Sequence, residues 1–335
     1  MDEVIKLAHG SGGKLTHALV QQVFLPYFDN PALAAMNDSA VVQLLGGHLA
    51  FTTDAYVVQP LFFPGGDIGR LAISGTVNDL SAQGARPVVI SAAFIIEEGM
   101  KVEELRRVVA SMAATAREAG VSVVAGDTKV VAAGAADKLF ITTAGVGTLL
   151  LQDAPTGSGA RVGDVVIVTG TIGDHGMAVL SARAGLALES ALRSDVAPLN
   201  RLVEGLLLQG IAVHAMRDPT RGGIATTLNE IAMASNVEIV VDEERVPVAD
   251  EVRGACELLG FDPLYVGNEG KMVIMVPAEE EGRTLAYLHG HPLGRRAATI
   301  GSVTAQGKGR VLLKTAVGGH RILDMLVGEQ LPRIC

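Results

Sequence analysis

The sequence has 335 residues, of which 49% are hydrophobic and 4% aromatic, and its formal net charge is −9. This length suffices for two ordinary domains with sizeable cores. The acidic balance argues against a nucleic-acid-binding surface, although acidic enzymes that use magnesium and nucleotides are common.

The first motif is the glycine-rich stretch HGSGGK at residues 9–14, within an expected N-terminal arm at residues 1–36. Its small residues leave backbone N–H groups accessible and its lysine adds positive charge, so the stretch can wrap a phosphate. The glycine spacing is not that of a Walker A loop, and no strand precedes it. A flexible arm without a ligand is the alternative. The candidate ligand-binding residues here are Gly10, Ser11, Gly12, Gly13 and Lys14.

Two strands are expected at residues 40–44 and 49–53, joined through a pair of glycines. Asp38 precedes the first strand, and Asp54 follows the second. Both carboxylates are therefore predicted to lie at strand ends.

The stretch FPGGDIGRLAISGTVNDLSAQGARP follows and is predicted to form a helix. Asp67 occupies the N-cap position before an apolar periodic segment, and Gly84 marks the end of the helix. Ala72, Gly75 and Asp79 are spaced to share one face, which is almost free of large side chains. Such a face lets another backbone or a ligand approach beside Asp79. A tightly packed helix pair with a surface aspartate is the alternative.

The next elements are a buried strand at 88–96, an amphipathic helix at 101–119, a short strand at 121–125 that ends in GDTK at 126–129, and a strand at 140–151. The aspartates at the ends of elements in this half are Asp38, Asp54, Asp79 and Asp127. Four carboxylates brought together raise one another's pKa unless cations lie among them. Mg²⁺ meets this need because it prefers oxygen ligands and binds phosphate. Four separate turn aspartates are the alternative.

Residues 153–163 are rich in Gly, Pro and Ser and are expected to mark a domain boundary, after which a second α/β segment begins. A strand is predicted at 164–169, and helices are predicted at 177–187, 224–234 and 252–259. The motif DPTRGG precedes the second of these helices, where Asp218 or Thr220 could cap it and Arg221 could help to bind an anion. Ordinary capping is the alternative. Glu269, in the motif NEGK, is either a placed acid or base or a solvated turn residue.

A hairpin is predicted at 310–326, and Cys335 is the last residue of the sequence. The eight residues 328–335 reach about 26 Å when extended, so this thiol could be a carrier, a metal ligand or part of a frayed end. The other cysteine, Cys256, is expected to be an inert core thiol. Two distant cysteines form no disulfide framework, residues 1–10 lack the apolar core of a signal peptide, and no apolar run is long enough to span a membrane. We therefore expect a cytoplasmic protein.

Together these motifs resemble one family over essentially the whole chain. HGSGGK, the block TTDAYVVQPLFFPGGDIGRLAISGTVNDLSAQGARP, GDTK, TGTIGDHG, DPTRGG, NEGK and the final LPRIC occur in this order in the hydrogenase maturation proteins of the HypE family. Members of this family are carbamoyl dehydratases that act in the synthesis of the cyanide ligands of nickel–iron hydrogenases. The NDL and glycine-rich motifs are shared with a superfamily that includes aminoimidazole ribonucleotide (AIR) synthetase, thiamine-monophosphate kinase and selenophosphate synthetase. The PRIC ending distinguishes HypE within it.

The resemblance implies a two-domain AIR synthetase-like fold of the α/β (α+β) class. An ATP-binding and dimerisation domain at 37–152 is expected to form a β-barrel shared in a homodimer. A C-terminal α/β domain at 153–317 would follow, and then a hairpin end and mobile tail at 318–335. ATP and Mg²⁺ would lie in a cleft under the glycine-rich loop.

The resemblance also implies roles for individual residues, carried over by motif position. Residues implied to hold the metal and the triphosphate are Asp38, Asp54, Asp79 and Asp127, with Asn78 beside them. Lys129 and Glu269 would flank the reacting carbamoyl group, and Cys335 would be the carrier thiol. These three are the catalytic candidates.

In HypE-like proteins the partner HypF places a carbamoyl group on the terminal thiol, and ATP-dependent dehydration gives a thiocyanate for the iron carried by a HypC–HypD complex. Amide oxygen is a poor leaving group, so phosphorylation must activate it. Glu269 is the candidate general base, and Lys129 would stabilise developing charge. One rival is another superfamily enzyme acting on a small substrate. Another is a nucleotide-binding scaffold whose Cys335 ligates a metal in an assembly complex.

Overall fold

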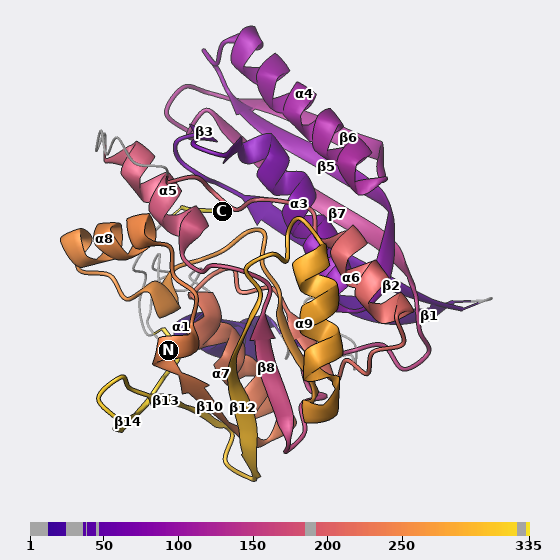
Figure 1. Cartoon of the computed structure of the whole chain (residues 1–335). Coiled ribbons are helices and arrows are strands. Elements are labelled where there is room, and N and C mark those ends of the chain that lie inside the picture. The colour runs from indigo at the N-terminus through magenta and orange to yellow at the C-terminus, as the bar shows by residue number, and fades with distance from the viewer. Residues whose placement is uncertain (1–12, 25–35, 38, 45–46, 185–191, 327–332) are drawn as a thin grey trace.

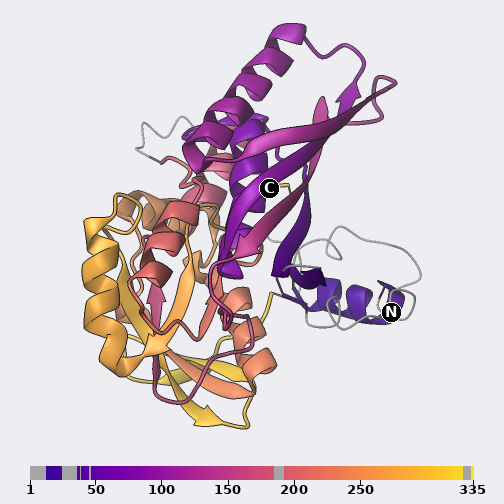
Figure 2. The same ribbon diagram turned by 90° about the vertical axis from the view of Figure 1, so that its right-hand side faces the viewer.

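The computed structural model describes residues 13–24, 36–37, 39–44, 47–184, 192–326 and 333–335. Two sheets organise these residues, one in each half of the chain (Figure 1). Helices of the second half lie between them, and the C-terminal end of the chain lies near the junction in both views (Figures 1 and 2).

The first half forms a five-stranded sheet in the order β1-β2-β7-β5-β6. Its strands are β1 (Ala40–Leu44), β2 (Gly47–Tyr56), β5 (Ala85–Glu97), β6 (Ser122–Val131) and β7 (Leu139–Leu149). β5 and β6 are parallel and are connected through helix α4 (Val102–Ala119), whereas the other neighbours are antiparallel. Helix α3 (Ile68–Ala82) packs on one face of this sheet and against α4, whereas the opposite face of strands β5 and β7 is not covered by any helix of the described residues (Figure 2).

The predicted helix after Asp67 is confirmed as α3. The Asp67 carboxylate accepts hydrogen bonds from the backbone N–H groups of Gly69 (2.7 Å) and Arg70 (3.1 Å), which satisfies two donors at the helix start. Nearly the whole helix is buried, and a Cβ on Gly75 would lie 2.3 Å from the hydroxyl oxygen of Tyr56. The bare face of the helix therefore accommodates an aromatic side chain from β2.

Three strand predictions differ from the structure. Two strands are longer than predicted because their pairing continues, and one strand is less buried. β2 continues past Asp54, and β6 continues through the whole GDTK motif because β5 pairs with it as far as Val131. β6 is an edge strand and is exposed along almost its entire length. β5 was expected to be buried, but its side chains alternate and Val88 and Ile95 are exposed.

The second half forms a seven-stranded sheet in the order β14-β13-β10-β12-β8-β11-β9. Its strands are β8 (Asp164–Val168), β9 (Ala215–Arg217), β10 (Val237–Asp242), β11 (Val273–Pro277), β12 (Ala298–Gln306), β13 (Arg310–Lys314) and β14 (His320–Ile322). Among these described strands, β10 and β13 are the one parallel pair. The predicted hairpin at 310–326 is confirmed in the antiparallel pair β13 and β14.

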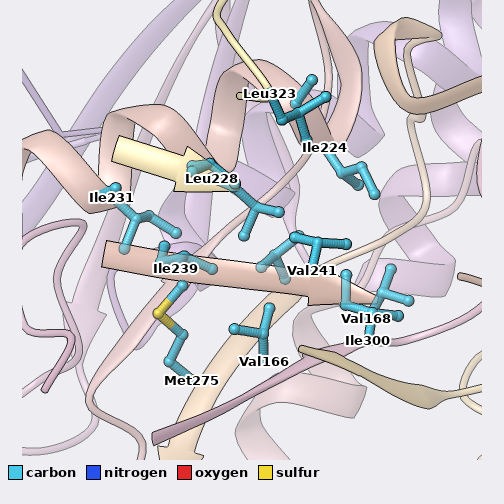
Figure 3. Close-up of a cluster of buried hydrophobic side chains, with 14 of the residues drawn as sticks. Val166, Val168, Ile224, Leu228, Ile231, Ile239, Val241, Met275, Ile300 and Leu323 are labelled. Carbon is cyan, nitrogen blue, oxygen red and sulfur yellow. The ribbon is translucent and has the colours of Figure 1, made fainter. Parts of the chain in front are cut away.

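Helices cover both faces of this sheet. They are α5 (Asp174–Arg183), α6 (Asn200–Leu208), α7 (Gly223–Ser235), α8 (Asp250–Leu259) and α9 (Glu281–Gly290). Figure 3 shows Ile224, Leu228 and Ile231 of α7 against Ile239 and Val241 of β10. Fully burying such a side chain stabilises the fold by about 1.5–3 kcal/mol. The predicted helices at 224–234 and 252–259 are confirmed as α7 and α8, and the one expected at 177–187 begins earlier, as α5.

Strand β8 is buried on both faces, which explains its unbroken apolar sequence. Val166 and Val168 belong to the core under α7, whereas Val165 and Ile167 belong to a second core with residues of α6 and α9. Alternate side chains of a strand point to opposite faces, so this strand contributes to two hydrophobic layers.

The remaining elements are short. They are α1 (Lys14–Leu19), the π-helix η2 (Val20–Phe24), β3 (Phe62–Phe63), β4 (Gly66–Asp67), and the 3₁₀ turns η3 (Glu243–Arg245), η4 (Pro263–Tyr265) and η5 (Ala278–Glu280). Within the described segments, no helix has the length and apolar character needed to cross a bilayer.

Candidate functional site

A cavity of about 240 Å³ lies at the junction of the two halves. One wall comes from β2 and α3, and another comes from β9, α7 and the loops beside them. The cavity is predominantly polar in its lining, and Cys335 contributes to it. The thiol-bearing residue thus lies among charged side chains of both halves.

The wall from the first half presents two carboxylates. Its residues are Thr53, Asp54, Ala55, Tyr56, Gly75 and Asp79. The hydroxyl of Thr52 donates a hydrogen bond to Asp79 Oδ2 (2.8 Å), which ties the end of α3 to β2. Asp54 is in register with Thr143 of β7, whose side chain contacts Thr76 of α3. Asp54 therefore lies on the face of the sheet that is covered by α3, the helix that carries Asp79.

The wall from the second half combines acids and arginines. Its residues are Arg217, Asp218, Thr220, Arg221, Thr227, Glu230 and Glu269. Arg217 Nη2 lies 3.3 Å from Glu230 Oε2. Negative charge at Cys335, and then at Asp54 and Glu269, raises the pKa of the Arg221 guanidinium, which therefore stays charged inside the cavity. The expected side-chain cap of α7 is wrong, because Gly222 occupies the N-cap position and no side chain caps the helix.

Glu269 is an acid of the cavity with a strongly perturbed pKa. Burial raises its pKa well above the ordinary value, the charges of Asp218 and Asp54 raise it further, and Arg221 opposes them. Its backbone is fixed by Asp195, which accepts hydrogen bonds from the N–H groups of Glu269 (3.2 Å) and Gly270 (3.1 Å). A carboxyl group with a raised pKa is a stronger base once ionised, which suits it to accept a proton.

Residues 333–335 are bound along residues 57–59. The N–H of Val57 donates to the carbonyl oxygen of Cys335 (3.1 Å), and the N–H of Gln59 donates to that of Arg333 (3.1 Å). The side chain of Ile334 is buried in the core of the first half. A mobile tail was expected from 318 onwards; residues 333–335 are held in place, and residues 327–332 lie outside the described part of the chain.

Asn78 is a structural connector between the two halves. Its amide nitrogen donates to the carbonyl oxygens of Ala197 (3.1 Å) and Glu269 (3.2 Å), and its Oδ1 accepts from the N–H of Leu199 (2.8 Å). Asn78 is 1% exposed and does not line the cavity. In this arrangement its hydrogen-bonding atoms are used by the protein itself, and its expected position beside the metal and the triphosphate stays a prediction.

Asp127 and Lys129 lie on the other face of the first sheet. Asp127 is in register with Ala93 on β5, which pairs with Thr142 and through it with Ala55. Residues in register share a face, and this row alternates with the row that contains Asp54. Asp127 and Lys129 are exposed, lie 3.5 Å apart between Oδ2 and Nζ, and are absent from the cavity lining. The structure thus unites two of the four predicted aspartates, Asp54 and Asp79.

The glycine-rich loop is described only at its end. Gly10, Ser11 and Gly12, together with Asp38, lie outside the described residues. Gly13 is buried, and a Cβ there would lie 2.0 Å from the carbonyl oxygen of Leu326. Lys14 forms an ion pair with Asp324. In this structure the end of the loop therefore contacts the segment that precedes the tail, and its role in phosphate binding stays a prediction.

Several cavity residues were not predicted from the sequence. Tyr56 follows Asp54 by two positions, so alternation along a longer β2 would have placed both on one face. Arg217 and Glu230 lie in two consecutive elements, β9 and α7, and the pairing of β9 with β11 and the packing of α7 bring them together. No local motif marks these two residues.

The two converging carboxylates fit a magnesium ion that arrives with a nucleotide. Mg²⁺ usually keeps several waters and binds one or two carboxylates together with substrate phosphates. Asp54 and Asp79 supply such oxygen ligands on one wall. Within the described residues, no three side chains of His, Cys, Asp or Glu converge closely enough to hold a metal without that help.

Two family models match the chain. The N-terminal domain of the AIR synthase related proteins matches residues 36–149, and their C-terminal domain matches residues 161–314. A carbamoyl dehydratase HypE from Cupriavidus necator is 50% identical over 332 residues, covering 99% of this chain and 95% of that protein.

Solved structures resemble the whole fold. A hydrogenase maturation protein HypE in complex with ATP is 52% identical with a TM-score of 0.84, and the match covers 98% of each chain. A chain from a HypE–HypF complex is 48% identical with a TM-score of 0.87, covering 92% of this chain and 100% of that chain. The expected two-domain AIR synthetase-like fold is confirmed, whereas the shared β-barrel of a homodimer stays a prediction.

Proposed function

The chain belongs to the HypE family of carbamoyl dehydratases, and we propose that it uses ATP to dehydrate a carbamoyl group on its own Cys335 to a thiocyanate. The product would supply a cyanide ligand during nickel–iron hydrogenase maturation. The observation that carries this proposal is the position of Cys335 in a cavity with Asp54, Asp79 and Glu269. A scaffold would not need its thiol beside carboxylates suited to Mg²⁺ and proton transfer.

The reaction has two steps, phosphorylation of the carbamoyl oxygen and elimination of phosphate. The carbamoyl oxygen attacks the γ-phosphoryl group of ATP, which releases ADP and one N–H proton. The C–O bond then breaks, phosphate leaves with the former carbamoyl oxygen, and loss of the second N–H proton leaves a C≡N group on sulfur. Activation by phosphorylation is needed because a free amide oxygen is a poor leaving group.

The residues of the cavity supply the remaining requirements. Glu269 is the base that accepts an N–H proton, because its raised pKa gives its ionised form a high proton affinity. Asp54 and Asp79 would hold a Mg²⁺ ion, which would supply positive charge to neutralise the triphosphate. Arg221, which stays charged, stabilises negative charge that develops on the transferring phosphoryl group or the leaving phosphate.

A homodimer would explain the uncovered face of the first sheet. Phe51 and Ile95 are exposed apolar side chains in the rows of this face, which alternate with the rows that face α3. An apolar sheet face and an unpaired edge strand such as β6 are commonly covered by another chain. We infer that a second copy packs here.

That arrangement would also place polar side chains of the same face at the interface. Asp127 and Lys129 lie on this face and outside the cavity of their own chain. A second copy would bring them toward a shared nucleotide site, where Lys129 could stabilise charge on the carbamoyl group. HypF would load the thiol, and a HypC–HypD complex carrying iron would receive the cyanide.

The test is to follow the mass of the C-terminal peptide. Chain carbamoylated at Cys335 is mixed with ATP and Mg²⁺, and the peptide is expected to lose the mass of one water as ADP forms. Chain with Cys335→Ser should accept no carbamoyl group and show no ATP-dependent mass change, while still binding ATP. A carbamoylated peptide whose mass does not change with ATP would favour the scaffold over the enzyme.

A further inference from the structure

Two side chains of α5 bind the main chain of residues 333 and 334. His175 Nε2 lies 2.6 Å from the carbonyl oxygen of Ile334, and Arg183 Nη2 donates to that of Arg333 (2.7 Å). Arg183 Nε also donates to the carbonyl oxygen of Gln59 (2.9 Å), so one guanidinium joins the tail to the segment that pairs with it. Neither side chain lines the cavity or takes part in the proposed chemistry.

The hydrogen bonds around His175 select one neutral tautomer. A carbonyl oxygen can only accept, so Nε2 must carry the proton that is shared with Ile334. On the other side Nδ1 lies 2.8 Å from the hydroxyl of Ser194, which accepts from the N–H of Val196 (3.1 Å). The Ser194 hydroxyl proton is therefore available to Nδ1. Neutral His175 satisfies all of these groups, with Nε2 directed at the tail.

The surroundings of His175 keep this arrangement fixed. The ring is fully buried, and Phe63 packs against it edge to face with ring centroids 5.4 Å apart. Burial lowers the pKa of the imidazole, which favours the neutral form that the hydrogen bonds require. A buried donor held by packing on one side and by Ser194 on the other loses little freedom when the tail binds it.

We propose that His175 is a positioning residue that holds residues 333–335 in the bound state and so places Cys335 in the cavity, with Arg183 as its second clamp. The proposal rests on the proposed function for its catalytic consequence, but the binding of the tail can be measured separately. His175 lies in the motif TGTIGDHG, to which the proposed chemistry assigns no role.

The experiment measures how often Cys335 leaves the cavity. A maleimide attached to a polyethylene glycol chain is too large for a cavity of about 240 Å³, so it labels only the released thiol. His175→Phe keeps a ring against Phe63 and removes the donor. Loss of a hydrogen bond to a buried carbonyl shifts the equilibrium by about fivefold or more, and labelling should accelerate by that factor. His175→Gln, which restores an N–H donor near the Nε2 position, should return the rate towards that of the unmodified chain.

Matched variants separate this role from a general loss of stability. His289 Nε2 also lies 2.9 Å from a carbonyl oxygen, that of Ala297, at a site remote from the tail. His289→Phe should leave labelling of Cys335 unchanged. Should His175→Phe fail to fold, Arg183→Met tests the same binding from the edge of the site and should also accelerate labelling.

The catalytic consequence is read in a single turnover of the carbamoylated chain. His175→Phe should slow dehydration about fivefold or more while leaving the affinity for ATP unchanged. Unaltered labelling of Cys335 in folded His175→Phe and Arg183→Met would overturn the proposal. A chain with native residues that shows no dehydration would instead refute the proposed function, and the labelling result would still decide the role of His175.

Discussion

Replacing Asn78 by alanine should destabilise the protein more than it weakens nucleotide binding. The change removes three hydrogen bonds and leaves the N–H of Leu199 and the carbonyl oxygen of Ala197 without their partner, whereas the carbonyl oxygen of Glu269 still accepts from the N–H of Ala197 (3.3 Å). Each unsatisfied buried group costs about 1–3 kcal/mol. With two such groups, the free energy of unfolding should fall by about 2 kcal/mol or more.

Chemical denaturation measures this loss, and a parallel titration measures ATP affinity. Asn229→Ala is a suitable control, because Asn229 is also buried but donates to Ala225 and Leu323 (2.8 Å each) within the second half alone. It should destabilise that half without changing how the halves are joined. If Asn78→Ala changed the unfolding free energy by less than about 1 kcal/mol but abolished ATP binding, Asn78 would be a nucleotide ligand and our reading of it as a connector would fail.

Three other predictions concern Glu269, Gly75 and Ile95. Burial raises the pKa of Glu269 in the folded chain above its ordinary value of 4.5, so the free energy of unfolding falls as the pH rises from 4.5 through the raised pKa. Over that pH range, denaturation curves should show Glu269→Gln gaining stability relative to the unmodified chain. The variant should still bind ATP but lose its dehydratase activity. Gly75→Ala should lower the melting temperature and ATP affinity because its Cβ meets Tyr56, unlike Gly254→Ala, which meets no atom within 4 Å. Ile95→Glu should convert a dimer to monomers in sedimentation, because Ile95 is exposed on the face that carries Asp127; an unchanged mass would contradict the proposed interface.

Local signals in the sequence predicted helices α3, α4, α5, α7 and α8, whereas α6 and α9 were not predicted. Asp67 is a side-chain cap whose effect extends over one turn, and Gly120 ends α4 in the left-handed conformation with φ of 76°. Such features depend on near neighbours in sequence, so spacing alone identifies them. The resemblance to the HypE family, which depends on the order of many motifs, was confirmed as well.

The site was predicted less completely because its geometry depends on strand pairing. Asp127 seemed equivalent to Asp54 when both were placed at strand ends, but continued pairing puts GDTK inside β6 and directs Asp127 to the other face. Asn78 sits beside Asp79 in sequence, yet one residue along a helix is a rotation of about 100°, enough to direct it into the contact between the halves. Neither outcome can be inferred without knowing which segments meet.

The residues that hold the end of the chain contact it mainly through its backbone. Val57, Gln59, His175 and Arg183 all reach carbonyl oxygens of residues 333–335. No hydrogen bond of this set involves the sulfur atom, so a substituent there need not alter them. These four backbone contacts can therefore persist through successive chemical forms of the cysteine.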